Sequence, residues 1–268
     1  MSDPASQQTV GHGATAASAD AVGFRAAARL FSRPQLVTFP MIALALIIPV
    51  YLLIGSALMR AHTLHAPAVA LDSAIPVDPA WSVIYLSLFL AALLPVFVVH
   101  QQALIRRVIF AYLAAWLIAY GFFLAYPTIC PRPEQAVAGK DFSSWLLRAI
   151  YSADVPCNCF PSLHVAQSFL AAFICYKVHR GIGAAAVVWA CLVAASTLYT
   201  KQHYVVDVVT GAALGYGAYL AFVRSYARDA TPAIERRLAP YLALGAVTTY
   251  GLLVAIMWIA YSNGVVIS

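Results

Sequence analysis

The chain has 268 residues, of which 63% are hydrophobic and only 10% are charged, and its formal net charge is +6. With a mean hydropathy of +0.82, this composition is typical of a polytopic membrane protein and excludes a soluble globular one. The apolar segments are continuous rather than alternating, which excludes a transmembrane β-barrel.

The first 34 residues differ in composition from the rest. Residues 1–20 are rich in Ser, Ala, Gln and Gly and lack the basic start and compact apolar stretch of a cleaved signal peptide, so we expect a disordered tail. Around residues 23–34, three arginines alternate with apolar residues, which favours a short interfacial helix on an anionic membrane surface. We therefore divide the chain into a tail at 1–34 and a transmembrane domain at 35–268.

Seven apolar stretches come close to the length needed to cross a bilayer. They lie at about 36–59, 81–99, 108–126, 162–176, 184–199, 204–223 and 241–262. The fourth and fifth are short, so we expect them to extend into polar flanks or to cross obliquely. The predicted fold is an all-α membrane bundle of six to seven transmembrane helices.

The distribution of Lys and Arg predicts the orientation. With the N-terminus in the cytoplasm, eleven of the 16 basic residues fall on the inner side, and the other five fall outside: Arg60, Arg132, Lys140, Arg148 and Lys201. The net charge is then a topology signal, and the chain has no basic domain that would indicate a nucleic-acid partner. We expect a bacterial inner-membrane protein whose outer face is periplasmic.

Three polar clusters come to that outer face by chain threading alone. The third span ends in AYPTICPRPE, the fourth begins with FPSLH, and STLYTKQHYVVD joins the fifth to the sixth. His203 and Asp207 are four residues apart, which puts them one turn apart on one face of a helix. A carboxylate beside an imidazole sets its tautomer and makes the other ring nitrogen a better nucleophile. His164 supplies a second imidazole that can protonate a leaving oxygen.

Candidate anion-binding groups accompany these histidines. Arg132 offers a planar fork suited to phosphate oxygens. Ser162, at the start of a helix, can add its hydroxyl and backbone N–H, and Lys201 adds a point charge. Two histidines, a carboxylate and cations together predict phosphoryl transfer. The structural alternatives are a helix cap for Ser162 and a lysine that reaches to the interface for Lys201.

These motifs resemble the type-2 phosphatidic acid phosphatase superfamily, which also contains vanadium haloperoxidases. Its signature has three parts, Lys-x6-Arg-Pro, Pro-Ser-x-His and Ser-Arg-x5-His-x3-Asp. The matching residues, within about 105–223, are Arg132-Pro133, Pro161-Ser162-Leu163-His164, and Ser196 with His203 and Asp207. The stretch YTKQHY looks similar to the branch that includes inositol phosphorylceramide synthases, an inositolphosphotransferase branch.

Three positions depart from that signature. Ala125 stands where the first-motif lysine falls, Leu163 stands where glycine is common, and Thr197 stands where the third-motif arginine falls. Two of the family's phosphate-binding cations are therefore missing from their usual places. Lys201 is a candidate replacement for one of them.

The resemblance implies a mechanism that uses no metal or other cofactor. His203 attacks phosphorus to give a phosphohistidine, Asp207 orients it, and His164 protonates the departing alcohol and then activates the acceptor. Arg132, Ser162 and Lys201 neutralise the negative charge of the transition state. Water as acceptor makes the enzyme a lipid phosphatase, and a sugar or lipid hydroxyl makes it a phosphotransferase.

The expected substrate is a phospholipid, a sphingolipid or a polyprenyl phosphate in the membrane, and the oligomeric state is left open. One transferase alternative makes an inositol-phosphate sphingolipid-like product. Two alternatives of other classes are a transporter with polar residues along its path and a non-catalytic protein that binds a lipid phosphate.

Three cysteines fall on the outer face beside the expected site. In an oxidising periplasm, Cys130 can pair with Cys157 or Cys159, and we predict one such disulfide. Zinc bound by His164, His203 and Asp207 is disfavoured, because the spacing lacks a strong metal signature and the nearby cations oppose a divalent ion. The acidic loop residues Glu134, Asp141 and Asp154 are expected to be solvated charges.

Overall fold

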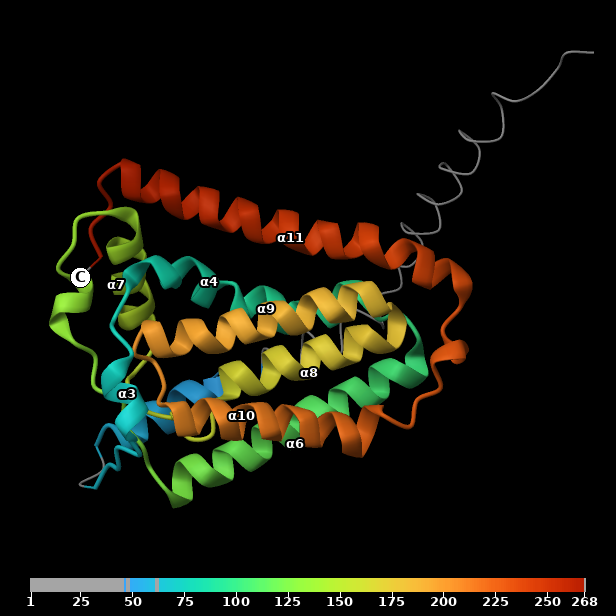
Figure 1. Cartoon of the computed structure of the whole chain (residues 1–268), viewed down its shortest axis with the longest axis horizontal. Helices are drawn as coiled ribbons and strands as arrows, with labels where there is room; N and C mark the ends of the chain where they lie inside the picture. The colour runs from blue at the N-terminus through green and yellow to red at the C-terminus, as the bar shows by residue number, and fades with distance from the viewer. Residues whose placement is uncertain (1–45, 47–48, 61–62, 268) are drawn as a thin grey trace, which may run out of the picture.

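The computed structural model describes residues 46, 49–60 and 63–267, and it confirms an all-α membrane protein. In this part of the chain four helices are long and apolar enough to cross a membrane (Figure 1): α6 (Gln102–Ala125), α9 (Arg180–Tyr199), α10 (Val205–Ala218) with the π-helical turn η3 (Tyr219–Val223), and α11 (Ala233–Ser262). Shorter apolar helices lie at Pro49–Leu58, Pro79–Leu90 and Leu163–Val178. The predicted tail and interfacial helix lie outside the described residues.

The predicted second span is interrupted. It forms α4 (Ser82–Leu86) and α5 (Leu88–Val98), which meet at Ser87. The fourth and fifth spans form α8 (Leu163–Val178) and α9, with only His179 between them. The ring of His179 accepts the backbone N–H of Ile182 at 3.3 Å, which caps α9. Because α9 begins at Arg180, its helix extends into a polar flank, as predicted. The remaining short helices are α3 (Ala70–Ala74), η1 (Pro79–Trp81), η2 (Glu134–Val137), α7 (Phe142–Ala153) and η4 (Arg228–Ala230).

Helix α8 is the centre of the bundle. Of its 16 residues, 11 are buried, and it packs against α5, α6, α9 and α10. A helix that is apolar all round is expected in such a position. Figure 1 shows α8 between α9 and α10, and its N-terminal end carries the Pro-Ser-x-His motif.

Two glycines of α10 allow it to approach α8 closely. A Cβ at Gly211 would lie 2.4 Å from the carbonyl oxygen of Ser162, and a Cβ at Gly215 would lie 2.4 Å from that of Ala166. Small residues four apart let helix backbones approach one another in membrane proteins. The two glycines therefore set the distance between the start of α8 and the start of α10, where the motif histidines lie.

We expect Gly211→Ala to lower the free energy of unfolding by about 1–3 kcal/mol, the usual cost of overpacking. The clash is with a backbone carbonyl, which cannot move aside as a flexible side chain can. Gly217→Ala is the matched control in the same helix, because a Cβ there meets nothing within 4 Å. Thermal denaturation in detergent measures both variants, and equal melting temperatures would contradict this account.

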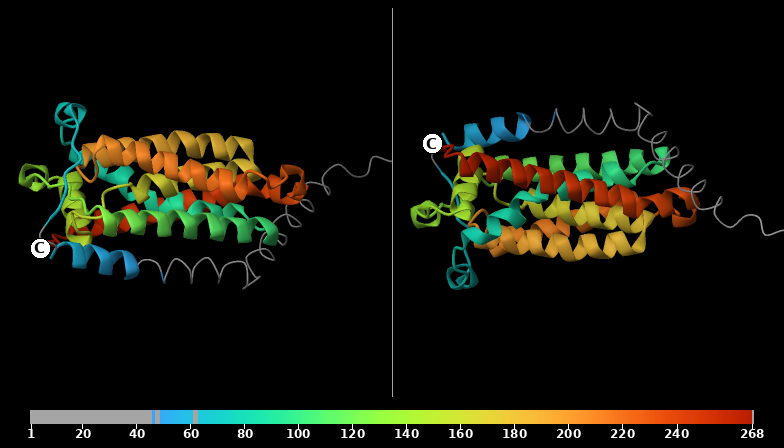
Figure 2. Two further views of the ribbon diagram at one scale, coloured as in Figure 1. Left: turned by 90° about the horizontal axis from the view of Figure 1, so that it is seen from below. Right: turned by 90° about the horizontal axis from the view of Figure 1, so that it is seen from above.

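The segment between α6 and α8 covers one end of the bundle (Figure 2). Within it, α7 is a helix that the hydropathy analysis missed. Its N-cap is Asp141, whose side chain accepts the N–H of Ser144 at 3.0 Å, and Trp145 donates to the carbonyl of Val265 at 2.7 Å. A capping residue followed by an amphipathic stretch could have predicted this helix.

The opposite end of the bundle holds the turns before α6, between α8 and α9, and between η3 and α11. The Arg107 guanidinium donates to Phe222 and Ser225 there, and the Lys177 ammonium donates to the carbonyls of Arg224 and Tyr226. Most of the described basic residues that we assigned to the cytoplasm lie toward this end. Which end faces the cytoplasm stays a prediction.

Candidate active site

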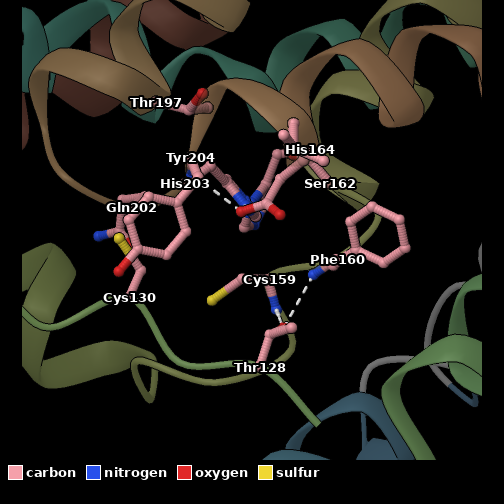
Figure 3. Close-up of polar contacts among 12 residues, drawn as sticks. Thr128, Cys130, Cys159, Phe160, Ser162, His164, Thr197, Gln202, His203 and Tyr204 are labelled. Atoms are coloured by element: carbon pink, nitrogen blue, oxygen red, sulfur yellow. Dashed lines mark hydrogen bonds and ion pairs between the residues drawn. The ribbon is translucent and has the colours of Figure 1, made fainter. Parts of the chain in front are cut away.

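The structure brings the two motif histidines into direct contact. His164 lies in the first turn of α8 and His203 lies two residues before α10. Nδ1 of His164 and Nε2 of His203 are 2.9 Å apart, and the rings meet edge to face (Figure 3). His203 is only 4% exposed. Two segments that are separate in sequence thus build one imidazole pair, in which His203 is buried and His164 is partly buried.

Asp207 lies behind this pair, in the first turn of α10. Its Oδ2 accepts the N–H of Tyr204 at 2.9 Å and lies 3.5 Å from Nδ1 of His203. That second distance is an ion-pair contact without hydrogen-bond geometry, and Nδ1 of His203 and Oδ1 of Asp207 are both buried without a hydrogen-bond partner among the described residues. The backbone carbonyl of Asp207 accepts the N–H of Ser162 at 3.0 Å. One residue therefore connects the second and third motifs.

The geometry favours one pair of tautomers. A proton on Nδ1 of His203 faces the Asp207 carboxylate, which leaves the Nε2 lone pair to accept a proton from Nδ1 of His164. In this arrangement Nε2 carries the nucleophilic lone pair. A small closure of the 3.5 Å contact would give the carboxylate–imidazole hydrogen bond that holds this tautomer.

Tyr85 and Ser162 help to fix the position of His164. Tyr85 of α4 is buried and packs edge to face against the ring of His164, with ring centroids 5.6 Å apart. Ser162 is the N-cap of α8, and its Oγ accepts the N–H of Val165 at 3.3 Å. The alternative interpretation of Ser162 as a helix cap is therefore present in the structure, and its phosphate contact stays a prediction.

Arg132 is tied to the loop around the histidines. Its Nη1 donates to the carbonyls of Tyr151 and Asp154, each at 2.6 Å, and its Nη2 donates to Oε1 of Gln202 at 3.0 Å. Its Nε is buried with no hydrogen-bond partner in the described part of the chain. Because Gln202 directly precedes His203, these bonds place the guanidinium next to the pair and leave one donor unused.

Lys201 points to a different segment. Its Nζ donates to the carbonyls of Asp72 at 3.2 Å and Ile75 at 2.6 Å, in and just after α3. Oδ1 of Asp72 in turn accepts the N–H of Val205 at 2.8 Å and so caps the start of α10. The role of Lys201 as a replacement phosphate ligand stays a prediction, and Asp72 is a site-supporting residue that the sequence analysis missed.

Asp154 is not the solvated loop charge that the sequence suggested. Its Oδ2 accepts the Tyr51 hydroxyl at 3.2 Å and its Oδ1 accepts the N–H of Val155 at 2.9 Å. Burial raises the pKa of Asp154, while the nearby Arg132 guanidinium opposes that rise. The expectation failed because Tyr51 lies 103 residues away in the chain, so no pattern around Asp154 predicts this contact.

We expect Asp154→Asn to raise thermal stability at neutral pH and to have little effect in acid. A carboxyl whose pKa is higher in the folded than in the unfolded state lowers stability once it ionises, and this cost disappears as the pH falls through the folded-state pKa. The measurement is the difference in melting temperature between variant and wild type across the acidic range. Glu134→Gln, at an exposed carboxylate of η2, reports the effect of removing one surface charge. If the difference in melting temperature between Asp154→Asn and wild type does not change with pH, the raised pKa of Asp154 is contradicted.

All five cysteines are free thiols in the structure, and the three beside the site are buried. Sγ of Cys130 donates to the carbonyl of Lys201 at 3.3 Å, whereas Sγ of Cys157 lies 3.1 Å from the sulfur of Met59. The disulfide of Cys130 with Cys157 or Cys159 therefore stays a prediction. Burial raises the pKa of Cys130 to about 12, so this thiol is protonated at neutral pH and is a poor nucleophile.

Comparison with known proteins agrees with the motif assignment. A family profile described as the PAP2 superfamily matches residues 59–221. The chain belongs to the PAP2 superfamily. This match covers all three motif segments, and membership supports a phosphatase-type membrane enzyme.

A PA-phosphatase related-family protein of Dictyostelium discoideum is 26% identical over 113 residues, which make up 38% of this chain and 20% of that protein. The chain thus matches about a fifth of the length of this curated relative. No solved structure matches the chain at a comparable level of significance. The predicted superfamily is confirmed, and the inositol phosphorylceramide synthase branch stays a prediction.

Proposed function

We propose that this protein is a lipid phosphatase or phosphotransferase that works through a phosphohistidine on His203. The observation that carries the proposal is the contact between the two imidazoles, 2.9 Å from Nδ1 of His164 to Nε2 of His203, with the Asp207 carboxylate 3.5 Å behind the second ring. This is the order of groups that nucleophilic transfer needs: a proton donor, a nucleophile and an orienting anion.

The first step breaks the bond between phosphorus and the lipid oxygen. The Nε2 lone pair of His203 attacks phosphorus, an imidazolium at His164 gives its Nδ1 proton to the leaving oxygen and becomes neutral, and the Nδ1 proton of His203 stays against Asp207. Because the two rings touch, the phosphoryl group has to enter between them and replace their mutual hydrogen bond. Entry of the phosphoryl group also frees the Nδ1 proton of His164 to point toward the leaving oxygen.

The second step regenerates the enzyme. His164, now neutral, takes the proton of the acceptor hydroxyl while its oxygen attacks the phosphohistidine, and Nε2 of His203 leaves with its lone pair. Arg132 supports charge on the equatorial oxygens through its Nε, which has no hydrogen-bond partner among the residues that the structure describes, and the Ser162 hydroxyl can donate while it caps α8. Lys201 would join them only by leaving the carbonyls that it now binds.

The acceptor divides the proposal into two candidate reactions. Water gives a phosphatase for a phospholipid, sphingolipid or polyprenyl phosphate, acting from the periplasmic side of a bacterial inner membrane. A hydroxyl acceptor gives a head-group transferase, which the similarity of Tyr199–Tyr204 to the inositolphosphotransferase branch favours. A transporter and a silent lipid-binding relative are the alternatives of another class.

Product analysis by mass spectrometry tests the proposal. Detergent-purified protein is incubated with monoester, pyrophosphate and diester lipids, alone and with hydroxyl acceptors, beside a His203→Ala variant. Inorganic phosphate that depends on His203 identifies a phosphatase, and a new head-group lipid identifies a transferase. If neither wild type nor variant forms a product from any substrate, the proposed enzymatic activity is refuted and the lipid-binding alternative is favoured.

A further inference from the structure

A second set of chemically active residues overlaps the site, and one of its members has no role in the proposed reaction. A ligand atom from each of Cys159, His203 and Asp207 lies within 4.8 Å of the other two, and all three residues are buried. Cys159 lies in the loop before α8, on the same side of the histidines as Thr128 (Figure 3). Phosphoryl transfer uses the histidine and the carboxylate, but it has no use for a thiol.

The loop holds Cys159 in this position. The backbone N–H groups of Cys159 and Phe160 both donate to Oγ1 of Thr128, each at 3.1 Å (Figure 3). Thr128 itself is fully buried. The thiol donates to the carbonyl of Pro156 at a long 3.5 Å, and its sulfur also interacts with the Thr128 side chain. The loop therefore fixes the position of the sulfur beside His203 and Asp207.

The other two residues also present unused atoms. Nε2 of His203 is occupied by His164, whereas Nδ1 has no hydrogen-bond partner within the described residues. Oδ2 of Asp207 accepts the N–H of Tyr204, whereas its buried Oδ1 has no hydrogen-bond partner in the described part of the chain. Buried polar atoms without partners are uncommon and call for an explanation. Here the unpaired nitrogen and oxygen belong to His203 and Asp207, the two residues that form a cluster with Cys159.

Thiol, imidazole and carboxylate together are a donor set that zinc and related borderline cations prefer. Three atoms that lie no more than 4.8 Å from one another have a common centre within about 2.8 Å of each, because a triangle with three 4.8 Å sides has a circumradius of 4.8 Å divided by √3. Zinc bonds are roughly 2.0–2.3 Å long, so a closure of less than about 1 Å per ligand completes the site. A thiolate and a carboxylate also neutralise the charge of a divalent ion, which offsets the nearby Arg132.

We propose that Cys159, His203 and Asp207 form an inhibitory site for zinc or another thiophilic divalent cation. The inhibition rests on the proposed function, whereas the binding does not. Binding releases the Cys159 proton to solvent and takes the Nδ1 lone pair of His203, so the one proton of the neutral ring moves to Nε2. A protonated Nε2 has no lone pair with which to attack phosphorus. The ion also takes the carboxylate that otherwise orients His203.

Metal binding is tested first, without any substrate. The parent protein is Cys191→Ser, because Cys191 is an exposed thiol on α9 that could bind metal by itself. Cadmium is titrated into this protein under a phosphine reductant, and the thiolate-to-metal charge-transfer absorption is recorded. We expect saturation at one equivalent in the parent, and loss of the band when Cys159→Ser is added.

Two further measurements keep the result interpretable. Asp207→Asn in the same parent retains an oxygen for the Tyr204 N–H and should weaken zinc binding by about tenfold or more, measured by competition with a chromophoric chelator. Thermal denaturation confirms that each variant is folded. An unchanged cadmium band in Cys159→Ser, or no stoichiometric binding by the parent, would overturn the proposed site.

Activity then separates the two proposals. Turnover with and without zinc is compared within each variant, and zinc should inhibit the parent but lose at least about tenfold in potency against Cys159→Ser. A cadmium band in a protein that turns over no substrate would leave the metal site standing and refute the proposed function. If the parent protein shows no cadmium band and its turnover is not affected by zinc, the metal site is refuted and the proposed function stands.

Discussion

Replacing His203 with alanine is expected to lower turnover by at least about 10³-fold on every substrate, because the covalent route loses its nucleophile. The effect should not depend on the leaving group or on the acceptor, since both steps pass through the same nitrogen. Release of phosphate, or formation of the transferred product, measures it. The lost ring is buried beside Asp207 and His164, so the melting temperature is recorded as well.

His65→Ala is the matched control for this variant. His65 lies at the same end of the bundle, but it is exposed and stacks on Tyr126, with ring centroids 4.5 Å apart. Its removal should leave turnover within about twofold of wild type. Retention of a tenth or more of wild-type activity in a folded His203→Ala protein would show that another residue is the nucleophile.

His164→Ala is expected to give a defect that depends on the leaving group. With a lipid alcohol, which needs a proton to depart, we expect a loss of about 10²–10⁴-fold, the usual contribution of a general acid. With an aryl phosphate, whose phenolate departs unprotonated, the first step should be nearly normal. The second step still lacks its base, so one equivalent of phenol should appear as a burst, followed by slow turnover.

Rapid-mixing measurement of phenol release distinguishes the two histidines. Wild type should turn over steadily, His164→Ala should give the burst, and His203→Ala should give neither. Equal losses on both substrates without a burst would instead mean that His164 acts only by holding His203 through their 2.9 Å contact.

Local sequence patterns predicted most of the helices, and the reason is the bilayer. A segment that crosses lipid must satisfy its backbone hydrogen bonds internally and present about 20 apolar residues, so hydropathy alone locates it. The fourth predicted span, 162–176, became α8 at Leu163–Val178. The spacing of His203 and Asp207 likewise predicted neighbours on one helix turn, although His203 lies just before α10 rather than in it.

The remaining features depend on contacts between segments that are distant in the chain. Ser87 interrupts the second span, and the amphipathic α7 lies flat across one end, which a search for continuous apolar runs does not detect. Carbonyls of a segment about 130 residues away bind the ammonium of Lys201, whose role as a phosphate ligand stays a prediction. Asp154 was expected in solvent, but Tyr51 and Arg132 surround it.

The sequence by itself determined the membrane class, the helical fold and the identity of the two histidines and the aspartate, because these follow from hydropathy and from spacing within single segments. Only the tertiary structure decided which atoms meet. It set Nδ1 of His164 against Nε2 of His203, placed Cys159 near His203 and Asp207, and bound the Lys201 ammonium to the carbonyl of Ile75. Side-chain direction follows from packing between helices, and here it depends on how closely Gly211 lets α10 approach α8. The sequence pattern of a single segment cannot predict the distance between α8 and α10.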